Sequence, residues 1–461
     1  MDPRLTAAII VGKLAAEATR TFGRGGGTAA PGLVAEQIDP LLLRHLTARL
    51  RYGSVIISGT NGKTTTSRLL AHILGAAGLQ GVHNRSGSNL TRGIASTLLD
   101  KSDLSGHVSA DIGLFEVDEA ALTSAAIQIV PRVLILTNLF RDQLDRYFEL
   151  DQVLLRWRRV VEHLPQETTL CLNADDPRVA TLGRYAKGRV IYFGVRESAH
   201  KLSDLPGSAD VLACPNCSQQ MNYEELYLGH QGKYFCSNCQ FKRPNLEVSA
   251  SKIALDGLQG LRFEMSTPKG GIGIHLGVPG FYNVYNALAA AAGAVALEMN
   301  LTAVQAGLGE FKAAFGRIER IPVGDKEILL TLVKNPAGFN EVLRMLSGTA
   351  HEHLLLALND LLADGRDVSW IWDVDLERLA DHRGPITISG IRAWDLADRL
   401  KYAGVNTGLL QVQPDLGLAL RQALDNTPEG QTLYILPTYT AMLELRQILT
   451  KMGHVQAFWE D

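Results

Sequence analysis

The amino-acid sequence predicts an α/β fold with two mostly parallel sheets and a small cysteine-rich insertion. Two observations carry this prediction. Apolar segments of strand length alternate with helical patterns in two stretches of the chain, and such alternation is typical of a parallel sheet covered by helices on both faces. Between these stretches, around residues 200–250, the alternation stops and two pairs of cysteines appear.

The composition is that of a globular protein without an export signal. The 461 residues are 46% hydrophobic and 20% charged, and the length suggests about two to four domains. No apolar run approaches the roughly 20 residues that cross a bilayer, and the N-terminal apolar run is too short for a signal peptide. We therefore expect a cytoplasmic protein. The net charge of −3 does not favour a nucleic-acid partner.

Residues 1–50 are predicted to form two helices joined by a glycine-rich loop at 23–32. Apolar residues of the first helix (Leu5, Ala8, Ile9) are soon followed by the charged Lys13. Such a helix either lies on a membrane surface or packs on its own domain, and we expect the second.

The first alternating stretch contains the predicted ligand site, because ligands bind at the carboxyl ends of the strands of such sheets. The predicted strands are 54–58, 112–117, 132–138, 168–172 and 189–194. The predicted helices lie near 64–78, 89–100, 119–128 and 151–163. Three features lie at strand ends in this pattern: residues 58–66 after the first strand, Glu116 at the end of the second, and Thr137 with Asn138 at the end of the third.

Residues 58–66 read Ser-Gly-Thr-Asn-Gly-Lys-Thr-Thr-Thr and join a predicted strand to a predicted helix. Such a turn directs backbone N–H groups at an anion, Lys63 adds a charge for the β- and γ-phosphates, and Thr64 adds a hydroxyl for Mg²⁺. The usual P-loop spacing is not met, because position 57 is Ile; an ordinary turn with a surface lysine is the alternative. The predicted nucleotide-binding residues are Gly59, Thr60, Asn61, Gly62, Lys63, Thr64 and Thr65.

Glu116 is predicted to bind Mg²⁺, because a carboxylate at a strand end beside a nucleotide loop is a suitable ligand. The alternative is an acidic residue at a helix N-terminus, which explains Asp118 and Glu119 equally well. Further along, Asp175 and Asp176 lie in a turn that is either structural or functional, and the sequence favours neither.

The cysteine pairs predict a zinc ribbon inserted at about residues 203–250. Cys214 with Cys217 and Cys236 with Cys239 form two C-x-x-C motifs, a spacing typical of four-thiolate structural Zn²⁺ sites. Aromatic residues between the pairs suit short hairpin strands. Cys171 lies outside, on a predicted strand, and is expected to be buried and inert.

The rest of the chain contains a β-rich segment at 246–276, an alanine-rich helix that begins near Asn283 and ends at about 298, and a loop at 315–320. Arg317 in that loop is a cation available for phosphate. We divide the chain into an N-terminal segment (1–50), a central nucleotide-binding domain (51–321) and a C-terminal α/β domain (322–461). The C-terminal strands are predicted at 328–333, 354–358, 386–389 and 432–436, and the helices at 337–347, 375–380, 394–402, 416–424 and 439–451.

One C-terminal loop, residues 359–373, contains several aspartates and two tryptophans just past a predicted strand. Such a loop is either a binding loop, which we favour, or a solvated loop anchored by its tryptophans.

These motifs resemble the Mur ligases, which use G-T-N-G-K-T as an ATP loop. Residues 137–146 resemble their T-N-x-x-x-D-H-L-D segment, and residues 334–336 resemble their Y-A-H-N-P turn. Asn283 and Arg317 fall where that family keeps an adenine-contacting Asn and a phosphate-contacting Arg. The resemblance implies a Mur ligase-like fold with a central ATPase domain and a C-terminal Rossmann-like domain, and it adds Asn335 to the nucleotide site.

The four-cysteine insertion, the loop at 364–373 and the Lys-Asn-Pro-Ala-Gly turn narrow the resemblance to the MurT family. Members are synthetase subunits that pair with a GatD-type glutaminase and amidate the α-carboxylate of D-glutamate in the lipid II stem peptide, through an acyl phosphate. The resemblance implies ATP, Mg²⁺ and Zn²⁺ as cofactors and lipid II at the inner face of the membrane as substrate. It implies a heterodimer with the glutaminase and no nucleic acid.

The resemblance also assigns catalytic roles. Lys63 and Glu116 serve phosphoryl transfer, and Asp367 completes the Cys–His pair of the glutaminase, with Asp360 and Asp364 as competing candidates. Amino-acid-adding Mur ligases have a metal-binding His where Gln143 stands. Because this chain departs from the family pattern there, we expect one Mg²⁺, bound by Thr64 and Glu116. Two alternatives remain, an amino-acid-adding Mur ligase and an ATP-regulated zinc-ribbon protein that binds nucleic acid.

Overall fold

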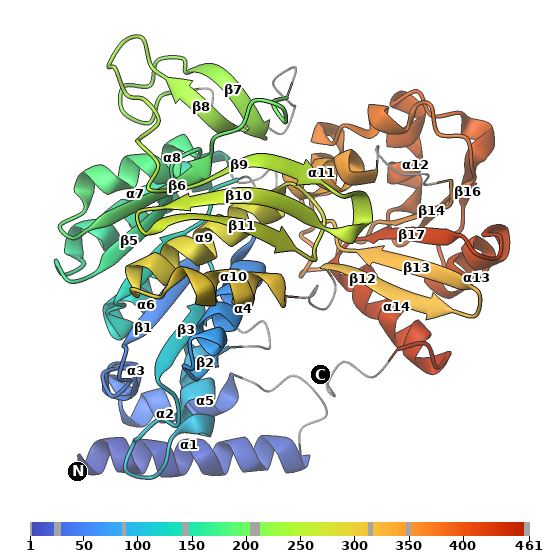
Figure 1. Cartoon of the computed structure of the whole chain (residues 1–461). Coiled ribbons are helices and arrows are strands. Elements are labelled where there is room, and N and C mark those ends of the chain that lie inside the picture. Colours follow the sequence, from blue (N-terminus) through green and yellow to red (C-terminus); the bar gives the residue numbers. More distant parts are fainter. Residues whose placement is uncertain are drawn as a thin grey trace.

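Two sheets organise the chain, and a small two-stranded sheet projects from the first (Figure 1). The computed structural model describes residues 2–22, 29–84, 89–140, 147–202, 213–311, 317–346 and 352–455. The first sheet has nine strands in the order β11-β10-β9-β6-β5-β4-β1-β3-β2, and the second has six in the order β12-β13-β17-β14-β15-β16. The predicted fold class, α/β with a central parallel sheet, is confirmed.

The first sheet is parallel from β2 to β9 and continues into the antiparallel strands β10 and β11. Its strands are β1 (Ser54–Ser58), β2 (Gly81–His83), β3 (Ile112–Glu116), β4 (Val133–Leu136), β5 (Thr169–Asn173), β6 (Val190–Val195), β9 (Val248–Leu255), β10 (Leu261–Thr267) and β11 (Gly270–Leu276). Its helices are α4 (Lys63–Ala76), α5 (Thr91–Lys101), α6 (Leu122–Ile129), α7 (Tyr147–His163), α8 (Pro177–Thr181), α9 (Tyr282–Ala296) and α10 (Leu301–Gly309). The short strand β2 has no counterpart among the predicted strands.

Side chains of β1 alternate between two cores, as the period of two in a strand requires. Val55 and Ile57 belong to the core under α4 and α9, whereas Ile56 belongs to the core under α5 and α6. The strand is buried on both faces, which explains why its sequence is continuously apolar.

The N-terminal segment folds as α1 (Pro3–Phe22), α2 (Ala30–Ile38) and α3 (Leu42–Thr47). Leu5, Ala8 and Ile9 are buried in the same core as α5, so this helix packs on its own domain, as expected. The predicted loop extends too far, because Pro31 and Gly32 already lie in α2, where Pro suits the first helical turn.

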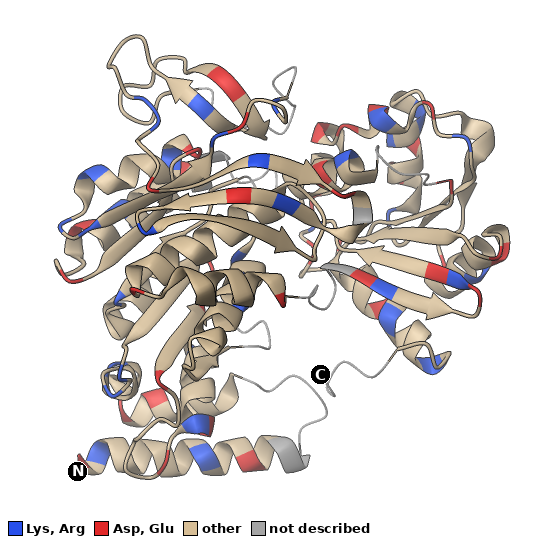
Figure 2. Ribbon diagram, viewed as in Figure 1, with Lys and Arg blue, Asp and Glu red and all other residues tan. Residues whose placement is uncertain are grey.

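Charged side chains of both signs are interspersed over the elements of both sheets (Figure 2). Among the described residues, no helix is both long and apolar enough to cross a membrane.

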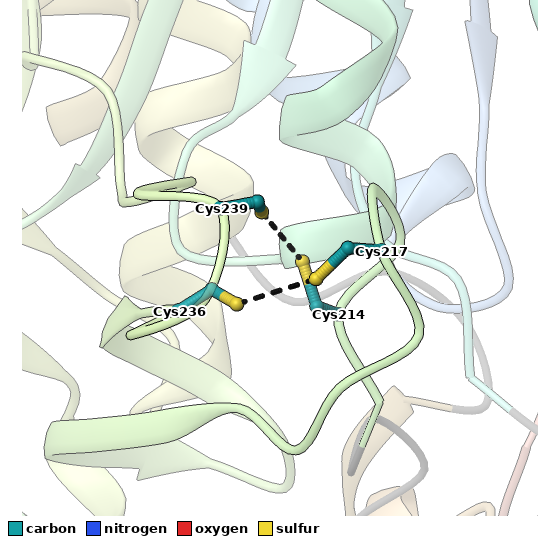
Figure 3. A group of neighbouring side chains, drawn as sticks. All are labelled: Cys214, Cys217, Cys236 and Cys239. Carbon is teal, nitrogen blue, oxygen red and sulfur yellow. Dashed lines mark hydrogen bonds between the residues drawn. The ribbon is translucent and has the colours of Figure 1, made fainter.

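The cysteine-rich insertion lies between β6 and β9 and contains the hairpin of β7 (Asn222–Leu228) and β8 (Gln231–Phe235). The hairpin strands that the aromatic residues predicted are therefore present. The two C-x-x-C motifs flank this hairpin and face each other (Figure 3). We call the described part of the insertion, residues 213–243, the ribbon.

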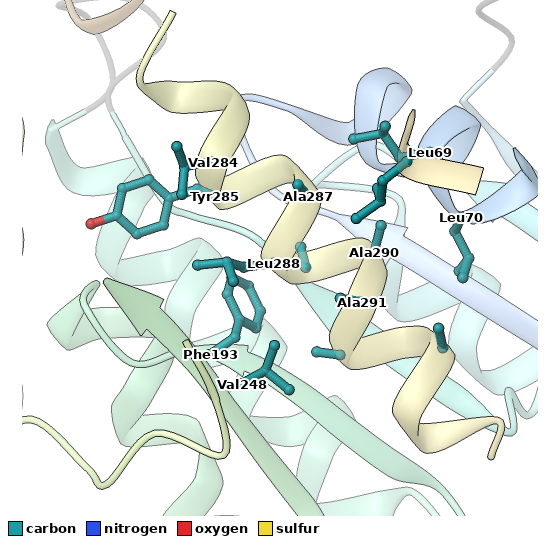
Figure 4. Packing of buried hydrophobic residues seen from close by; sticks show 14 of the residues in the cluster. Leu69, Leu70, Phe193, Val248, Val284, Tyr285, Ala287, Leu288, Ala290 and Ala291 are labelled. Atoms are coloured by element: carbon teal, nitrogen blue, oxygen red, sulfur yellow. The ribbon is translucent and has the colours of Figure 1, made fainter. Parts of the chain in front are cut away.

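Helix α9 packs tightly because six of its buried residues are alanines. Ala287, Ala290 and Ala291 lie against Leu69 and Leu70 of α4 in one core, together with side chains of β6 and β9 (Figure 4). Small side chains let helix and sheet approach closely, so the start of α9 is held firmly beside the start of α4.

The second sheet carries helices on both faces. Its strands are β12 (Arg317–Val323), β13 (Lys326–Thr331), β14 (Leu354–Ala357), β15 (Ile386–Ser389), β16 (Leu410–Val412) and β17 (Thr432–Pro437). Its helices are α11 (Pro336–Leu346), α12 (Ala393–Tyr402), α13 (Leu416–Asn426) and α14 (Tyr439–Lys451), with 3₁₀ turns at Ser369–Asp373 and Leu376–Leu379.

Two C-terminal predictions were wrong in part. The segment predicted as a loop at 315–320 becomes strand β12 from Arg317 onward, because it pairs antiparallel with β13 at the sheet edge. The expected boundary between residues 321 and 322 therefore falls within this strand. The predicted helix at 375–380 is a single 3₁₀ turn.

Helix α10 lies directly against α4 through Gly307. A Cβ atom at this glycine would lie 2.4 Å from the Cα atom of Ile73. We therefore expect Gly307→Ala to lower the free energy of unfolding by about 2 kcal/mol through overpacking. Gly75→Ala is the matched control, because Gly75 is also helical but has no atom within 4 Å of its added Cβ. That variant is expected to gain about 0.5–1 kcal/mol. Thermal melts in which both variants behave alike would contradict the packing argument.

Candidate functional site

The predicted phosphate loop joins β1 to α4, as expected. Gly59 and Gly62 have φ angles of +140° and +87°, which side chains other than glycine rarely adopt. A Cβ at Gly59 would meet Thr137 Oγ1, and a Cβ at Gly62 would meet Asn286 Oδ1, each at 2.1 Å. Both positions therefore require glycine for conformation and for space.

The loop is held by the residues that follow β4. Asn138 accepts a hydrogen bond from the Asn61 N–H at 2.8 Å and donates one to the Asn61 carbonyl at 3.0 Å. The Thr137 hydroxyl donates to the same carbonyl at 2.9 Å. The sequence placed Thr137 and Asn138 at a strand end beside the loop, and the structure brings them into direct contact with it.

Lys63 is buried, and its ammonium group lies at the first turn of α4. Its Nζ donates to the Gly59 carbonyl at 2.5 Å and forms an ion pair with Glu119 at 2.9 Å. The sequence suggested Glu119 as an acidic residue at a helix N-terminus, but α6 begins only at Leu122, so that interpretation was wrong. A phosphate in the loop would compete with Glu119 for this ammonium group.

Glu116 lies at the end of β3 beside the start of α4. Its Oε1 accepts hydrogen bonds from the Thr64 hydroxyl at 2.9 Å and from Asn89 at 3.0 Å. Asn84 fixes the Glu116 backbone by bonding both its N–H and its carbonyl, at 3.0 and 2.8 Å.

Thr64 and Glu116, the predicted Mg²⁺ ligands, are thus brought together. Adjacent ligands of an octahedral Mg²⁺ at about 2.1 Å lie about 3 Å apart, which matches the 2.9 Å between these two oxygens. The pair therefore fits a Mg²⁺ site. Asn84 and Asn89 are supporting residues that the sequence did not indicate, because they are far from Glu116 along the chain.

A cavity of about 120 Å³ lies where the two sheets and the ribbon meet. Its walls include Thr60, Asn61, Gly62, Asn138, Phe140, Leu228, Tyr285, Asn286, Lys334, Asn335 and Glu341. The side chain of Asn335 donates to Asn61 Oδ1 at 3.0 Å, which joins the C-terminal part to the phosphate loop.

For two predicted nucleotide residues, the structure shows no side chain at the cavity wall. Asn286, rather than Asn283, lines the cavity, and Asn286 donates to Asn283 Oδ1 at 2.9 Å. Asn283 itself donates to the Pro279 carbonyl at 2.7 Å. Arg317 begins β12, but its side chain lies outside the described residues, as does all of Gln143.

Glu341 adds an ionisable group to the cavity wall. Burial raises its pKa to about 7, and Arg344, whose guanidinium lies 3.7 Å away, partly opposes this shift. The wall therefore holds a carboxyl group that changes charge near neutral pH.

The four predicted zinc ligands are brought together. The sulfurs of Cys214, Cys217, Cys236 and Cys239 all lie within 4.8 Å of one another (Figure 3). Thiolates on a tetrahedral Zn²⁺ lie about 3.8 Å apart, so the four residues fit this metal. Cys171 is fully buried on β5, and burial raises its pKa, as expected for an inert thiol.

The turn after β5 proves structural. Asp176 accepts hydrogen bonds from two backbone N–H groups at the start of α8, and Asp175 forms a buried ion pair with Arg243 of the ribbon at 3.0 Å. Burial raises the pKa of Asp175 to about 6 despite this partner. Asp176 also lies 3.2 Å from His230 Nε2 of the ribbon, so both carboxylates connect the ribbon to the first sheet.

The three candidate aspartates of residues 359–373, which we call the acidic loop, lie in different environments. Asp360 forms an ion pair with Arg392 at 2.7 Å. Asp364 is buried and accepts a hydrogen bond from the Thr440 N–H at 2.8 Å. Asp367 is half-buried and accepts hydrogen bonds from Ser369 N–H and hydroxyl at 2.8 and 2.5 Å, which hold its carboxylate in one orientation.

The loop's two tryptophans also differ. Trp370 is buried in the C-terminal core, whereas 53% of the Trp372 surface is exposed. The first anchors the loop, and the second remains available on the surface.

Two family models match the chain. The Mur ligase middle domain matches residues 57–294, and the MurT ligase C-terminal model matches residues 332–442. The first covers the predicted phosphate loop, and the second covers the acidic loop.

Curated relatives match nearly the whole chain. It is 33% identical, over 96% of its own length and 97% of the relative's, to the MurT subunit of the glutamine-hydrolysing lipid II isoglutaminyl synthase of Staphylococcus aureus. The same subunit of Streptococcus pneumoniae is also 33% identical, over 97% of this chain and 98% of that one.

Solved structures support the fold. A pseudomurein peptide ligase type C from Methanothermus fervidus superposes with a TM-score of 0.67 at 23% identity, over 87% of this chain and 78% of that one. The architecture is thus that of the Mur ligases. With its relatives matched over almost their full length, the chain belongs to the MurT family of Mur ligase-like enzymes.

Proposed function

We propose that this protein is the synthetase subunit of a lipid II isoglutaminyl synthase, which amidates the α-carboxylate of D-glutamate in the lipid II stem peptide at the expense of ATP. The observation that carries the proposal is the convergence of Lys63, Thr64 and Glu116 at the mouth of the phosphate loop. The names of the full-length relatives support the choice of substrate.

The reaction needs activation, because a carboxylate does not react with ammonia at a useful rate. A carboxylate oxygen attacks the γ-phosphorus of ATP, and the bond between this phosphorus and the β-phosphate oxygen breaks. ADP is released, and the carboxylate has become an acyl phosphate. Ammonia then attacks the carbonyl carbon, the bond to phosphate breaks, and the nitrogen loses a proton. Backbone N–H groups of residues 59–63 and the Lys63 ammonium hold the phosphates in line for this transfer.

Thr64 and Glu116 would hold the Mg²⁺, which neutralises charge on the β- and γ-phosphates when bound. Arg317 is proposed as a further phosphate contact, and Asn283 and Asn335 as further nucleotide contacts. For Asn335 the hydrogen bond to Asn61 supports this assignment.

Ammonia is proposed to come from a GatD-type glutaminase bound in a heterodimer. Free ammonia is mostly protonated at neutral pH, so its release next to the acyl phosphate is an advantage. Asp367 is proposed to orient the catalytic His of that partner. The resemblance selects Asp367 over Asp360 and Asp364, and the hydrogen bonds from Ser369, which hold the Asp367 carboxylate in one orientation, support this choice.

The substrate places the protein at the inner face of the membrane as a peripheral protein. A nucleic-acid partner receives no support, because acidic and basic residues are interspersed along the described elements (Figure 2) and the net charge of the chain is −3. The name of the full-length relatives also disfavours an amino-acid-adding ligase.

Lys63→Ala is expected to lower the rate of ATP-dependent amidation by about 100-fold or more, because a cation that stabilises the transferring phosphoryl group is lost. The assay measures amidated lipid II from the complex with glutamine and ATP. Lys233→Ala, an exposed lysine paired with Glu224 on the ribbon, is the control and should leave the rate unchanged. Near-normal turnover by Lys63→Ala would refute the assignment of the ATP site.

The purified chain is expected to contain about one Zn²⁺, bound by Cys214, Cys217, Cys236 and Cys239. Cys236→Ser should lose this metal in elemental analysis and lower the melting temperature. Cys171→Ala is the control, since Cys171 lies outside the cluster, and it should retain the zinc. Unchanged zinc content in Cys236→Ser would rule out this ligand set.

Asp367→Asn is expected to slow glutamine hydrolysis by the complex by about 100-fold, because Asn cannot hold the required tautomer of the partner His. Amidation driven by a high concentration of free ammonia should survive. Asp360→Asn, in the same loop, is the control and should hydrolyse glutamine at the normal rate. The opposite pattern, with hydrolysis intact and ammonia-driven amidation lost, would place Asp367 in the ligase site.

A further inference from the structure

The turn of the ribbon hairpin reaches the wall of the nucleotide cavity. Leu228 lines the cavity. Gly229 has a φ of +55°, and a Cβ there would lie 2.7 Å from the ring of Phe140. The ring of His230 lies with its centroid 4.5 Å from that of Phe140, and His230 is fully buried. We call residues 228–231 the hairpin tip.

Phe140 connects the hairpin tip to the phosphate loop. The hydroxyl of Thr60 lies 3.1 Å from both the carbonyl oxygen and the N–H nitrogen of Phe140. Phe140 and Thr60 both line the cavity. A shift of the hairpin tip therefore displaces the ring of Phe140, a residue of the cavity wall whose backbone is hydrogen-bonded to Thr60 of the phosphate loop.

The hairpin strands next to the tip are held by contacts from both domains. The Gly232 N–H donates to the Asp175 carbonyl at 2.9 Å, and the Tyr234 hydroxyl donates to the Ala174 carbonyl at 3.0 Å. From the C-terminal side, Arg344 of α11 donates to the Tyr227 carbonyl at 3.0 Å. The hairpin thus spans the junction that encloses the cavity.

Burial of the hairpin tip costs free energy, because several of its polar atoms have no hydrogen-bond partner among the described residues. Gln231 is fully buried, and neither its Nε2 nor its Oε1 has a hydrogen-bond partner among the described residues. His230 Nδ1 is likewise buried without a partner there. Unsatisfied buried polar groups favour a hairpin that moves outward to meet water, so other contacts must hold it in place.

The four cysteines supply that restraint. Cys236 directly follows β8, and Tyr234 packs with Met221, Phe241 and the cysteines in a separate small core. An isolated two-stranded hairpin is marginally stable, so a metal that joins both ends of this one determines whether it keeps its shape.

We propose that the ribbon is a structural wall of the nucleotide cavity, so that Zn²⁺ at the four cysteines and the nucleotide in the cavity increase each other's affinity. This inference rests on the proposed nucleotide site. Coupling of this kind is reciprocal: if zinc raises nucleotide affinity by a given factor, nucleotide raises zinc affinity by the same factor. The ribbon then makes the ligase dependent on its structural metal, although no cysteine touches the nucleotide.

Gly229→Ala tests the contact without altering a cysteine. The added Cβ would press on Phe140, so we expect the dissociation constant of ADP, measured by calorimetry on the zinc-loaded full chain, to rise about tenfold or more. Gly324→Ala is the matched control. Gly324 also lies in a turn between antiparallel strands, with a φ of +58°, but its added Cβ meets nothing within 4 Å. Both variants carry the same backbone strain, so only their contacts differ.

Equal ADP affinity of the Gly229→Ala and Gly324→Ala variants, both with one bound zinc, would overturn the proposal. A second measurement uses the unchanged protein. Its zinc affinity, determined by competition with a chelator, should increase in the presence of saturating ADP by a factor matching the loss of ADP affinity on zinc removal. Zinc affinity that is insensitive to ADP would also overturn the proposal. Failure of the unchanged protein to bind ADP would refute the proposed function together with this inference.

Discussion

Asn61 is the residue through which the candidate site is assembled, and the geometry of the site depends on its hydrogen bonds. Its backbone N–H and carbonyl are bound by the residues that follow β4, which fixes the phosphate loop against the first sheet. Its side chain accepts a hydrogen bond from Asn335 of the C-terminal part. A loop with two glycines at positive φ would otherwise be conformationally free, so these bonds supply the preorganisation that phosphoryl transfer needs.

Around this centre, charge is arranged so that a bound phosphate replaces an existing partner. Lys63 is buried and would be costly to leave unpaired, and Glu119 compensates it. In the same way, the Thr64 hydroxyl donates a hydrogen bond to Glu116. Polar side chains are thus paired with one another where nucleotide and Mg²⁺ are proposed to bind. Binding would replace these contacts within the protein by contacts with the ligand.

The MurT-type insertion and acidic loop extend the Mur ligase plan in different directions. The ribbon is anchored inward, through Asp175 and Asp176, onto the turn after β5. The acidic loop is anchored by Trp370 in the C-terminal core and leaves Trp372 largely exposed. The first therefore contributes Leu228 to the cavity wall, whereas the second presents groups at the surface, where a glutaminase partner is proposed to bind.

The features that the sequence determined by itself are those encoded by neighbouring residues. The strand–glycine–lysine–helix pattern located the predicted phosphate loop, the C-x-x-C spacing located the cysteine cluster, and apolar periodicity located most strands and helices. Each depends on local backbone conformation or on ligand spacing along a short segment, so each is readable without the fold.

Only the tertiary structure decided the contacts between distant segments. Glu119 as the partner of Lys63, Asn286 in place of Asn283 on the cavity wall, and the contact of the hairpin tip with Phe140 join residues far apart in the chain. Strand β12 likewise forms because β13 supplies its hydrogen bonds, and its own pattern did not indicate a strand. Such contacts depend on how whole sheets and helices pack, and no local pattern records that packing.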